Sequence, residues 1–476
     1  MKKHKLTIIT LAVSLVYLAM LVAWHCYDPS KSFTEAVPGA DHRPAGNERK
    51  ADDVLIGEFF MKDSTVVSTS DLTGEWRCFR GANHDNIVKN DTKRTLVEGD
   101  FQDLWSVETG EGHASPVISA GKVYVLDYDE HLSSDALRCF DLQTGKQLWK
   151  RWYRVPMKRN HGFSRTIPVV WQNLVVTIGP EGHVMCCDKE NGEMKWSMDM
   201  KKRFDTEIPF WYTGQCPLVD EGVLVLAPAG KDTLMLGVDV LTGETRWATP
   251  NSVGFKMSHS SVMPITLSGT RTYVYIGVGG VCGVSAEEGK QGEMLWSANK
   301  WQPSVVAPSP LQIAPNQIFL VAGYGAGGGL LQVDKQGNTW NAVIKDSYKA
   351  SEGMSSEQQT PLNYNGMLIT ILPKDGGGMR ERLAMYSPDN LHKPVWTSAA
   401  DERFGLGPYL IVDDKLFAFK EDGELYVYGI DGKSMRLLRK QRIMDEGIDA
   451  WGPMAYADGM LVLRDSKSIK CIKVFE

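Results

Sequence analysis

Eight prolines at nearly constant spacing constrain the fold of this 476-residue chain more than any other feature. Each proline opens a short apolar segment, such as "PVIS" or "PLVD", and the successive intervals are 52, 49, 47, 46, 51, 47 and 45 residues. A regular period of this length predicts one repeated structural unit rather than several unrelated domains. The eight prolines are Pro116, Pro168, Pro217, Pro264, Pro310, Pro361, Pro408 and Pro453.

The repeated unit has the pattern of four short strands. In the first unit, "PVIS", "KVYVLD", "ALRCFD" and "KQLWK" follow one another, separated by polar or glycine-bearing turns. Alternating apolar runs bounded by turn residues predict strands, and a proline is tolerated at the first position of a strand. A four-stranded unit of about 45 residues that repeats radially is typical of a propeller blade. We therefore predict an all-β, eight-bladed β-propeller.

The two ends of the repeat predict how the ring closes. The last unit, after Pro453, contains only about three strands, whereas "DLWSVET" at residues 103–109 is a strand without the other three. Pairing of residues 103–109 with residues 468–475 would complete the eighth blade and leave no frayed ring end.

A second repeated phrase places Asp, Gly and Trp at intervals of four residues. The Asp side chain can accept backbone N–H groups in a turn, and Gly tolerates a positive φ. The Trp can pack against the neighbouring blade. We interpret the phrase as architecture rather than chemistry. Its three clearest copies are Asp141–Gly145–Trp149, Asp188–Gly192–Trp196 and Asp239–Gly243–Trp247.

The N-terminus predicts a membrane anchor over residues 1–26. Nineteen uncharged residues, Leu6 to Trp24, follow three lysines, and this length nearly spans a bilayer core of about 30 Å. Flanking lysines favour the cytoplasmic side, so the body is expected outside the inner membrane, in the periplasm or extracytoplasmic space. A cleaved signal peptide is the alternative, although Ala23–Cys26 makes a poor cleavage or lipidation site because His25 precedes Cys26.

The remaining segments complete the predicted organisation. Residues 27–73 are polar and rich in Pro and Gly, which predicts a linker. Residues 74–101 form a pre-propeller segment, and residues 102–476 form the propeller, which we expect to be monomeric. A net charge of −6 gives no reason to expect a nucleic-acid partner.

The repeat resembles a known family. "LRCFDLQTGKQLW", "VMCCDKENGEMKW" and "LGVDVLTGETRW" are similar to the tryptophan-docking repeat of eight-bladed propellers of the pyrroloquinoline-quinone (PQQ) type. "EWRCFRGANHDNI" and "VGGVCGVSAEEG" also resemble segments of this group, and the likeness extends over residues 74–476. The family contains quinone-dependent dehydrogenases and BamB-like non-catalytic members, so the resemblance implies a fold and leaves the activity open.

A quinone dehydrogenase of this family would need a carboxylate base, a calcium held by Glu and Asn oxygens, a stacking Trp and often a vicinal disulfide. Cys186-Cys187 is the nearest match to such a disulfide, but both fall where the repeat requires a strand. Cys139 occupies the same strand position as Cys186, which favours small buried side chains over a disulfide. We find no metal-ligand spacing and no nucleophile motif. PQQ with calcium is therefore kept only as an alternative to a chain without a cofactor.

Residues just before each inner strand should face the central channel. They form a polar ring in which Asp449 or Glu357 could act as a base and Arg165 could bind a quinone carboxylate. The simpler interpretation is a polar, solvent-filled channel. The channel candidates for ligand binding are His113, Arg165, Gln215, His259, Glu357, Gln358, Asp449 and Trp451.

Two longer loops are candidate contacts for a partner. Residues 200–215 mix charged residues with Trp211 and Tyr212, and residues 299–309 add Trp301. Exposed aromatic residues on a rigid scaffold suit protein or glycan partners, or they can cover the mouth of the ring.

Three hypotheses follow. The first is a non-catalytic, membrane-tethered propeller that binds envelope proteins or other envelope components. The second is a PQQ-dependent oxidoreductase, and the third is a carbohydrate-binding or carbohydrate-processing protein.

Overall fold

The computed structural model describes residues 2–28, 54–66, 68 and 71–476. The chain divides after residue 53 into two units. In the first unit, helix α1 (Lys2–Cys26) contains a segment from His4 to Cys26 that is long and apolar enough to cross a membrane. A signal sequence near the N-terminus has the same properties, so the helix supports an anchor or a signal and does not distinguish them.

The second unit is built from eight sheets, as the proline spacing predicts, and the four blade strands of each sheet pair antiparallel. The innermost strand of every sheet starts within two residues of its predicted proline. Short apolar strands repeat because each blade buries both faces against its neighbours. Blade 1 contains β4 (Val117–Ser119), β5 (Lys122–Asp129), β6 (Ser134–Asp141) and β7 (Gln147–Arg154), and blade 2 contains β8 (Val169–Trp171), β9 (Leu174–Ile178), β10 (His183–Asp188) and β11 (Met194–Asp199). Blade 3 contains β12 (Leu218–Asp220), β13 (Val223–Leu226), β14 (Thr233–Asp239) and β15 (Thr245–Pro250), and blade 4 contains β16 (Met263–Leu267), β17 (Thr270–Gly277), β18 (Gly280–Ser285) and β19 (Met294–Ala298).

Blades 5–8 follow the same order from the inside outwards. Strands β20 (Leu311–Ala314), β21 (Gln317–Ala322), β22 (Gly327–Gln336) and β23 (Thr339–Tyr348) form blade 5. Blade 6 contains β24 (Leu362–Tyr364), β25 (Met367–Ile371), β26 (Leu383–Tyr386) and β27 (Trp396–Thr397), and blade 7 contains β28 (Tyr409–Val412), β29 (Lys415–Phe419), β30 (Glu424–Asp431) and β31 (Ser434–Arg442). Blade 8 contains β32 (Ala455–Ala457), β33 (Met460–Arg464), β34 (Ser468–Lys473) and β3 (Gln102–Glu108).

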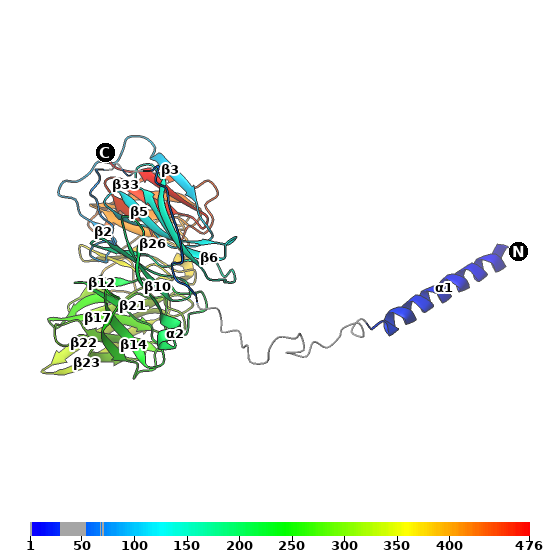
Figure 1. Ribbon diagram of the computed structural model, residues 1–476, viewed down its shortest axis with the longest axis horizontal. Helices are drawn as coiled ribbons and strands as arrows, with labels where there is room; N and C mark the ends of the chain where they lie inside the picture. The colour runs from blue at the N-terminus through cyan, green and yellow to red at the C-terminus, as the bar shows by residue number, and fades with distance from the viewer. Residues whose placement is uncertain (1, 29–53, 67, 69–70) are drawn as a thin grey trace. The chain divides into compact units, whose positions relative to one another are not determined.

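The predicted ring closure is confirmed. Strand β3 pairs antiparallel with β34, with Gln102 opposite Lys473 and Glu108 opposite Ser468. Figure 1 shows β3, in cyan, beside the red C-terminal strands. The first strand of the ring is therefore the outer strand of the last blade.

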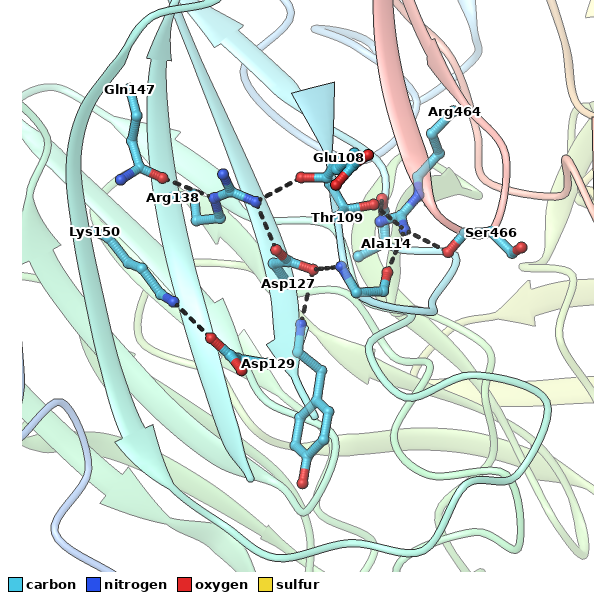
Figure 2. Close-up of polar contacts among 12 residues, drawn as sticks. Glu108, Thr109, Ala114, Asp127, Asp129, Arg138, Gln147, Lys150, Arg464 and Ser466 are labelled. Atoms are coloured by element: carbon cyan, nitrogen blue, oxygen red, sulfur yellow. Dashed lines mark hydrogen bonds and ion pairs between the residues drawn. The ribbon is translucent and has the colours of Figure 1, made fainter. Parts of the chain in front are cut away.

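Polar contacts join blade 8 to blade 1 behind this strand (Figure 2). The buried Arg464 guanidinium donates to the carbonyl oxygens of Ala114 at 3.0 Å and Ser466 at 3.2 Å. Asp127 accepts the Arg138 guanidinium at 2.8 Å, and Arg138 also donates to the Glu108 carbonyl oxygen at 3.0 Å. The closing strand is thus held by side chains as well as by its ladder.

The Asp-Gly-Trp phrase has the architectural geometry we expected. Asp141 accepts the backbone N–H groups of Gln143 and Thr144 at 3.1 and 2.9 Å. Gly145 has φ +68°, and a Cβ there would lie 2.6 Å from the Trp105 ring of blade 8. The same packing of a Trp on the next blade's Gly recurs for Trp149 on Gly192 and Trp196 on Gly243.

Two short elements of the structure were not predicted from the sequence. Most of the proposed linker 27–73, namely residues 29–53, 67 and 69–70, lies outside the described residues. Within its described part, strand β1 (Phe59–Lys62) pairs antiparallel with β7 as a fifth strand of blade 1. The propeller also contains a five-residue helix, α2 (Met200–Phe204), which Asp199 caps by accepting the Lys202 amide.

Candidate functional site

A cavity of about 310 Å³ lies on the propeller axis, because all eight connections between blades contribute to its wall. We call it the funnel. Polar and aromatic side chains alternate around it, and the pre-propeller segment supplies one end. Its lining residues are Phe79, Arg80, Asn86, His113, His161, Arg165, Ile167, Trp211, Gly214, Cys216, His259, Ser261, Val305, Ala307, Tyr324, Glu357, Gln358, Gln359, Thr360, Lys374, Leu406, Trp451 and Pro453.

Residues 76–87, which we call the floor segment, cross the axis on the side of the turns that follow the inner strands. Trp76 bridges to Ile118 of blade 1, and the Arg77 carbonyl accepts the Val170 amide of blade 2. Farther along, β2 (Ile87–Val88) pairs in parallel with β28 of blade 7. Between these contacts, Arg80 bonds to the carbonyls of Thr360 and Pro361 at the start of blade 6, opposite blade 2 in the ring, so the segment spans the channel.

Arg80 fixes the middle of the floor segment. Its guanidinium is 3% exposed and donates to the carbonyl oxygens of His84, Thr360 and Pro361 at 2.7, 2.9 and 3.1 Å. Burial lowers the pKa of Arg80 to about 10, so the side chain stays charged at neutral pH. A buried guanidinium satisfied by carbonyl oxygens places a fixed positive charge beneath the funnel.

Arg165 supplies a second guanidinium in the funnel wall. It donates to the carbonyl oxygens of Trp211 at 2.6 Å, Asn160 at 2.7 Å and His161 at 2.8 Å. These bonds use Nε and Nη2, and Nη1 has no hydrogen-bond acceptor among the described residues. Burial lowers its pKa to about 10. Arg165 therefore lines the cavity while it braces two loops of the wall.

The two predicted histidines in the wall are neutral at physiological pH. Burial, followed by the positive charge of Arg165, lowers the pKa of His113 to about 3 and that of His259 to about 4. The Nε2 atom of His259 is buried and has no hydrogen-bond partner among the described residues. A neutral imidazole with a free nitrogen can donate or accept, according to its tautomer.

Aromatic rings line the wall on two sides. Trp211 stacks on Tyr324 with ring centroids 5.5 Å apart and an interplanar angle of 18°. Elsewhere, Trp451 packs against His113 at 4.8 Å and donates its indole N–H to Glu421 at 3.2 Å. The rings give the funnel flat apolar surfaces beside neutral polar groups, a combination common in ligand pockets.

The structure brings most of the predicted channel residues together. Those that line the funnel are His113, Arg165, His259, Glu357, Gln358 and Trp451.

Two of the channel candidates lie elsewhere. Gln215 is fully buried, and its amide group bonds to both the N–H and the carbonyl of Ala227 at 2.9 Å. Asp449 is half-buried outside the wall, in a positive-φ turn at +51°. Burial, then the charges of Glu421 and Glu111, raises the pKa of the Asp449 carboxyl.

The aromatic loop residues also separate. Trp211 lines the funnel, and half-buried Tyr212 donates its hydroxyl to the Lys158 carbonyl. Trp301 is only 5% exposed and packs in the core between blades 4 and 5, so it offers no surface to a partner. Its indole occupies the space beside Gly329 of β22, where a glycine has no side chain.

Other wall residues were missed by the rule that the residues before each inner strand face the channel. Tyr324 and Lys374 come from loops between the second and third strands of their blades, and Arg80 comes from the floor segment. A tyrosine inside the glycine-rich stretch "GYGAGGG" was the available signal for Tyr324. No local signal marks Arg80, because its position depends on a crossing of the whole ring.

The funnel does not fit a calcium-bound quinone. Calcium takes six to eight oxygen ligands, usually including several carboxylates, whereas Glu357 is the only carboxylate in the wall. No group of three or more His, Cys, Asp or Glu within the described ranges could hold a metal ion. Cys186 and Cys187 are fully buried in β10 and face the hydrophobic clusters between blades. We therefore derive no chemical step from such a group.

Comparisons with known proteins agree with the architecture. Residues 133–351 match the family model described as "Outer membrane protein assembly factor BamB". None of the curated proteins compared with the chain matches it.

Among solved structures, the computationally designed protein Ika8 covers 79% of the chain with 14% identity and a TM-score of 0.51, over 100% of its own length. This likeness shows the fold alone. BamB from Moraxella catarrhalis covers 79% at 9% identity and a TM-score of 0.49, over 98% of its length. Quinohemoprotein alcohol dehydrogenase from Comamonas testosteroni covers 84% at 14% identity and a TM-score of 0.43, over 80% of its length.

Proposed function

We propose that this chain, an eight-bladed propeller with the PQQ-type repeat of BamB-like proteins over residues 133–351, is a non-catalytic binding module tethered to a membrane. Its ligand is a segment of a cell-envelope protein that enters the funnel from the side of the loops between blades. The name of the matched family describes an outer membrane protein assembly factor, and only the coarser role of protein binding is carried over to this chain.

The bonding and protonation of the arginines and histidines in the funnel support a binding role most directly. Arg80 and Arg165 bind backbone carbonyls, and His113 and His259 have pKa values far below neutrality. Among the described residues, neither histidine is bonded to a carboxylate or a nucleophile, so neither belongs to the kind of pair on which acid–base or covalent catalysis depends. A partly aromatic cavity whose guanidinium groups are already bonded to backbone carbonyls favours recognition.

The tether supports an extracytoplasmic location. Lys2, Lys3 and Lys5 stand at the N-terminal end of α1, and basic residues favour the cytoplasmic side of a membrane helix. The propeller would then lie on the other side, among envelope proteins.

A photo-crosslinking amino acid placed at the rim tests the proposal. Phe210 is 78% exposed in the loop beside Trp211, whereas Leu241, 59% exposed, lies in the turn between β14 and β15 and does not line the funnel. In envelope preparations, the proposal requires a defined protein adduct from position 210 that position 241 does not give. The substitution Ala307→Trp, which fills part of the funnel, should suppress that adduct.

A second arm addresses the oxidoreductase alternative. The full-length chain is incubated with PQQ and calcium, and both thermal stabilisation and dye reduction with alcohols or sugars are measured. Saturable stabilisation together with turnover would overturn the non-catalytic role. Equal adducts from positions 210 and 241 would show that the partner does not bind at the funnel.

A carbohydrate ligand is the second candidate, favoured by the stacked Trp211–Tyr324 pair at the rim. Aromatic faces stack on the apolar faces of sugars, and neutral amides and imidazoles suit hydroxyl groups. Displacement of the position-210 adduct by soluble envelope glycan would favour this candidate.

A further inference from the structure

The outer edge of a blade in this propeller already accepts an added strand. Strand β1 pairs antiparallel with β7, with Phe59 opposite Trp152 and Lys62 opposite Trp149. Phe59 stacks on Trp152 at 5.6 Å, and the Arg151 guanidinium lies 4.7 Å from the Phe60 ring centroid. Main-chain pairing with side chains clamped on both faces is therefore a mode of recognition that this fold supports.

Strand β31, the outer strand of blade 7, offers a comparable edge that no strand covers. It is nine residues long and stands at the end of its sheet, paired only with β30. Within the described part of the chain, the backbone of residues 434–442 makes no hydrogen bond to any segment other than β30. One row of its N–H and C=O groups is therefore available for pairing.

The strand is held in place before any partner arrives. Gln441 accepts the Phe101 amide at 2.7 Å and donates to the Phe101 carbonyl at 3.2 Å. The Arg439 guanidinium lies 4.6 Å from the Phe101 ring centroid and donates to the Val97 carbonyl at 2.8 Å. Because the edge is already ordered, little conformational entropy is lost when a strand adds to it.

The side chains of β31 define the partner's chemistry. Between residues 433 and 442 there are five basic residues and no acidic residue. Lys440 is paired with Glu424 at 3.2 Å, but Lys433 and Arg436 have no ion-pair partner among the described residues. Like charges on directly opposed strands are destabilising, so two copies of β31 would repel each other, whereas an acidic strand would be attracted.

Exposed leucines distinguish this edge from one that is merely protected by charge. Basic residues on edge strands commonly prevent aggregation, but such protection gives no reason to expose Leu437 at 40% and Leu438 at 38% on the same strand. Among the other outer strands of the described chain, only the four-residue β1 also exposes large apolar side chains, and it carries a single basic residue. Strand β27 has two residues, β15 ends at Pro250, and β23 carries Lys345 next to Asp346.

We propose that the outer edge of β31 is a docking site for an extended acidic segment of a partner protein, which adds to blade 7 as a further strand. Carboxylates of the segment would pair with Lys433 and Arg436, and its apolar residues would cover Leu437 and Leu438. This surface is separate from the funnel, so it can hold a partner whether or not the funnel is filled.

The test uses the full-length chain in a neutral detergent and a fluorescent, N-acetylated nonapeptide of alternating Glu and Val. The expected result is a saturable rise in anisotropy and slower hydrogen exchange of amides within residues 434–442. Two control peptides separate strand addition from simple charge attraction. One has Lys in place of Glu, and the other keeps the glutamates but has proline at every second position.

Matched variants locate the site. Arg436→Glu should weaken binding of the Glu-Val peptide about tenfold, whereas Lys345→Glu, an exposed basic residue on the outer strand of blade 5, should leave it unchanged. Both variants replace exposed side chains, and their melting temperatures should equal that of the parent. The proposal is wrong if the Glu-Val peptide shows no saturable binding, if the proline peptide binds equally well, or if both variants weaken binding to the same extent.

Discussion

At the scale of single residues, the ring depends on glycines that leave room for a tryptophan of the preceding blade. Gly145, Gly192 and Gly243 each have a positive φ and each lie against an indole ring, with space for no Cβ. The repeated Asp-Gly-Trp phrase therefore encodes two contacts at once. The Asp and Gly shape a turn within one blade, and the Gly with the Trp forms the contact between blades.

Substitution of Gly145 tests the interblade contact. Gly145→Ala should be destabilised by about 1–3 kcal/mol more than Gly432→Ala, because overpacking against Trp105 adds to the backbone strain. Gly432 also has a positive φ, +57°, but a Cβ there would meet nothing within 4 Å. The measurement is the urea midpoint of each variant in the full-length chain. Equal midpoints would show that a Cβ at position 145 is accommodated beside Trp105 without additional loss of stability.

Asp135 makes stability depend on pH. It is 1% exposed, and Tyr153 and Ser164 donate their hydroxyl groups to it at 2.9 and 3.2 Å. Burial nevertheless raises its pKa to about 7. Since the folded pKa lies above the unfolded value near 3.8, the folded state binds the proton more tightly. The stability from this group is fully present below pH 4 and is lost as the pH rises towards 7.

The variant Asp135→Asn removes this titration. The melting temperature of Asp135→Asn minus that of the parent should increase as the pH is raised from 4 to 8. Asp414→Asn is the control of opposite sign, because the lysine side chains of Lys415 and Lys93 lower the pKa of Asp414 to about 2. That variant should lose stability relative to the parent as the pH rises from 2 to 5. A constant difference between Asp135→Asn and the parent would contradict the buried, protonated carboxyl.

At the scale of elements, the decisive contact is the seam between the last blade and the first. Strand β3 completes blade 8, and Arg464 behind it bonds to the carbonyls of Gly110, Ala114 and Ser466 (Figure 2). Burial lowers the pKa of Arg464 to about 10, which still leaves it charged. Ring closure thus rests on a strand ladder and on two guanidinium groups, those of Arg464 and Arg138.

Arg464→Met should open this seam preferentially. The substitution leaves several buried carbonyl oxygens without a donor and should cost roughly 3 kcal/mol or more. Hydrogen exchange should accelerate in β3 and β34 while β17 in blade 4 remains protected. Arg246→Met, an exposed arginine on blade 3, is the control and should change neither region. Uniform acceleration over all eight blades would show that the seam is not the weakest point of the ring.

The sequence predicted those elements whose pattern is local. The prolines located the inner strands because a proline ends one connection and opens one strand, and the incomplete last unit located the closing strand. Strand β1 and the floor segment were not predicted, because "EFFMK" and "EWRCFRGANHDNI" carry no repeat. Their positions depend on surfaces contributed by blades far away in the chain.

The same distinction explains the wall of the funnel. Residues before the inner strands were placed correctly where their side chains reach the axis, as for His113 and His259. Gln215 turns back because the Ala227 backbone needs its amide, and Trp301 turns into the core because β22 is glycine-rich beside it. Such choices depend on a neighbouring strand rather than on the residue's own segment.

At the scale of the whole molecule, the chain joins an apolar helix to a propeller whose hydrogen-bonding and charged groups are largely satisfied internally. Seven of the eight cysteines are buried, six in the propeller and Cys78 in the floor segment, and Cys26, at the end of α1, is exposed. Burial raises the thiol pKa at buried positions, for example to about 12 for Cys187, which makes those thiols unreactive towards maleimides. The chain therefore carries one natural label site beside its membrane segment.

That site tests the orientation of the proposed anchor. If the lysines at the start of α1 remain in the cytoplasm, Cys26 lies at the opposite surface of the membrane. A charged, membrane-impermeant maleimide added to intact spheroplasts should label the chain once, and Cys26→Ser should abolish the labelling. A cleaved signal sequence would give a mature chain without most of α1, and mass spectrometry of the recovered chain would reveal it. Labelling that requires lysis of the cells would place Cys26 inside and would remove the extracytoplasmic location from the proposed function.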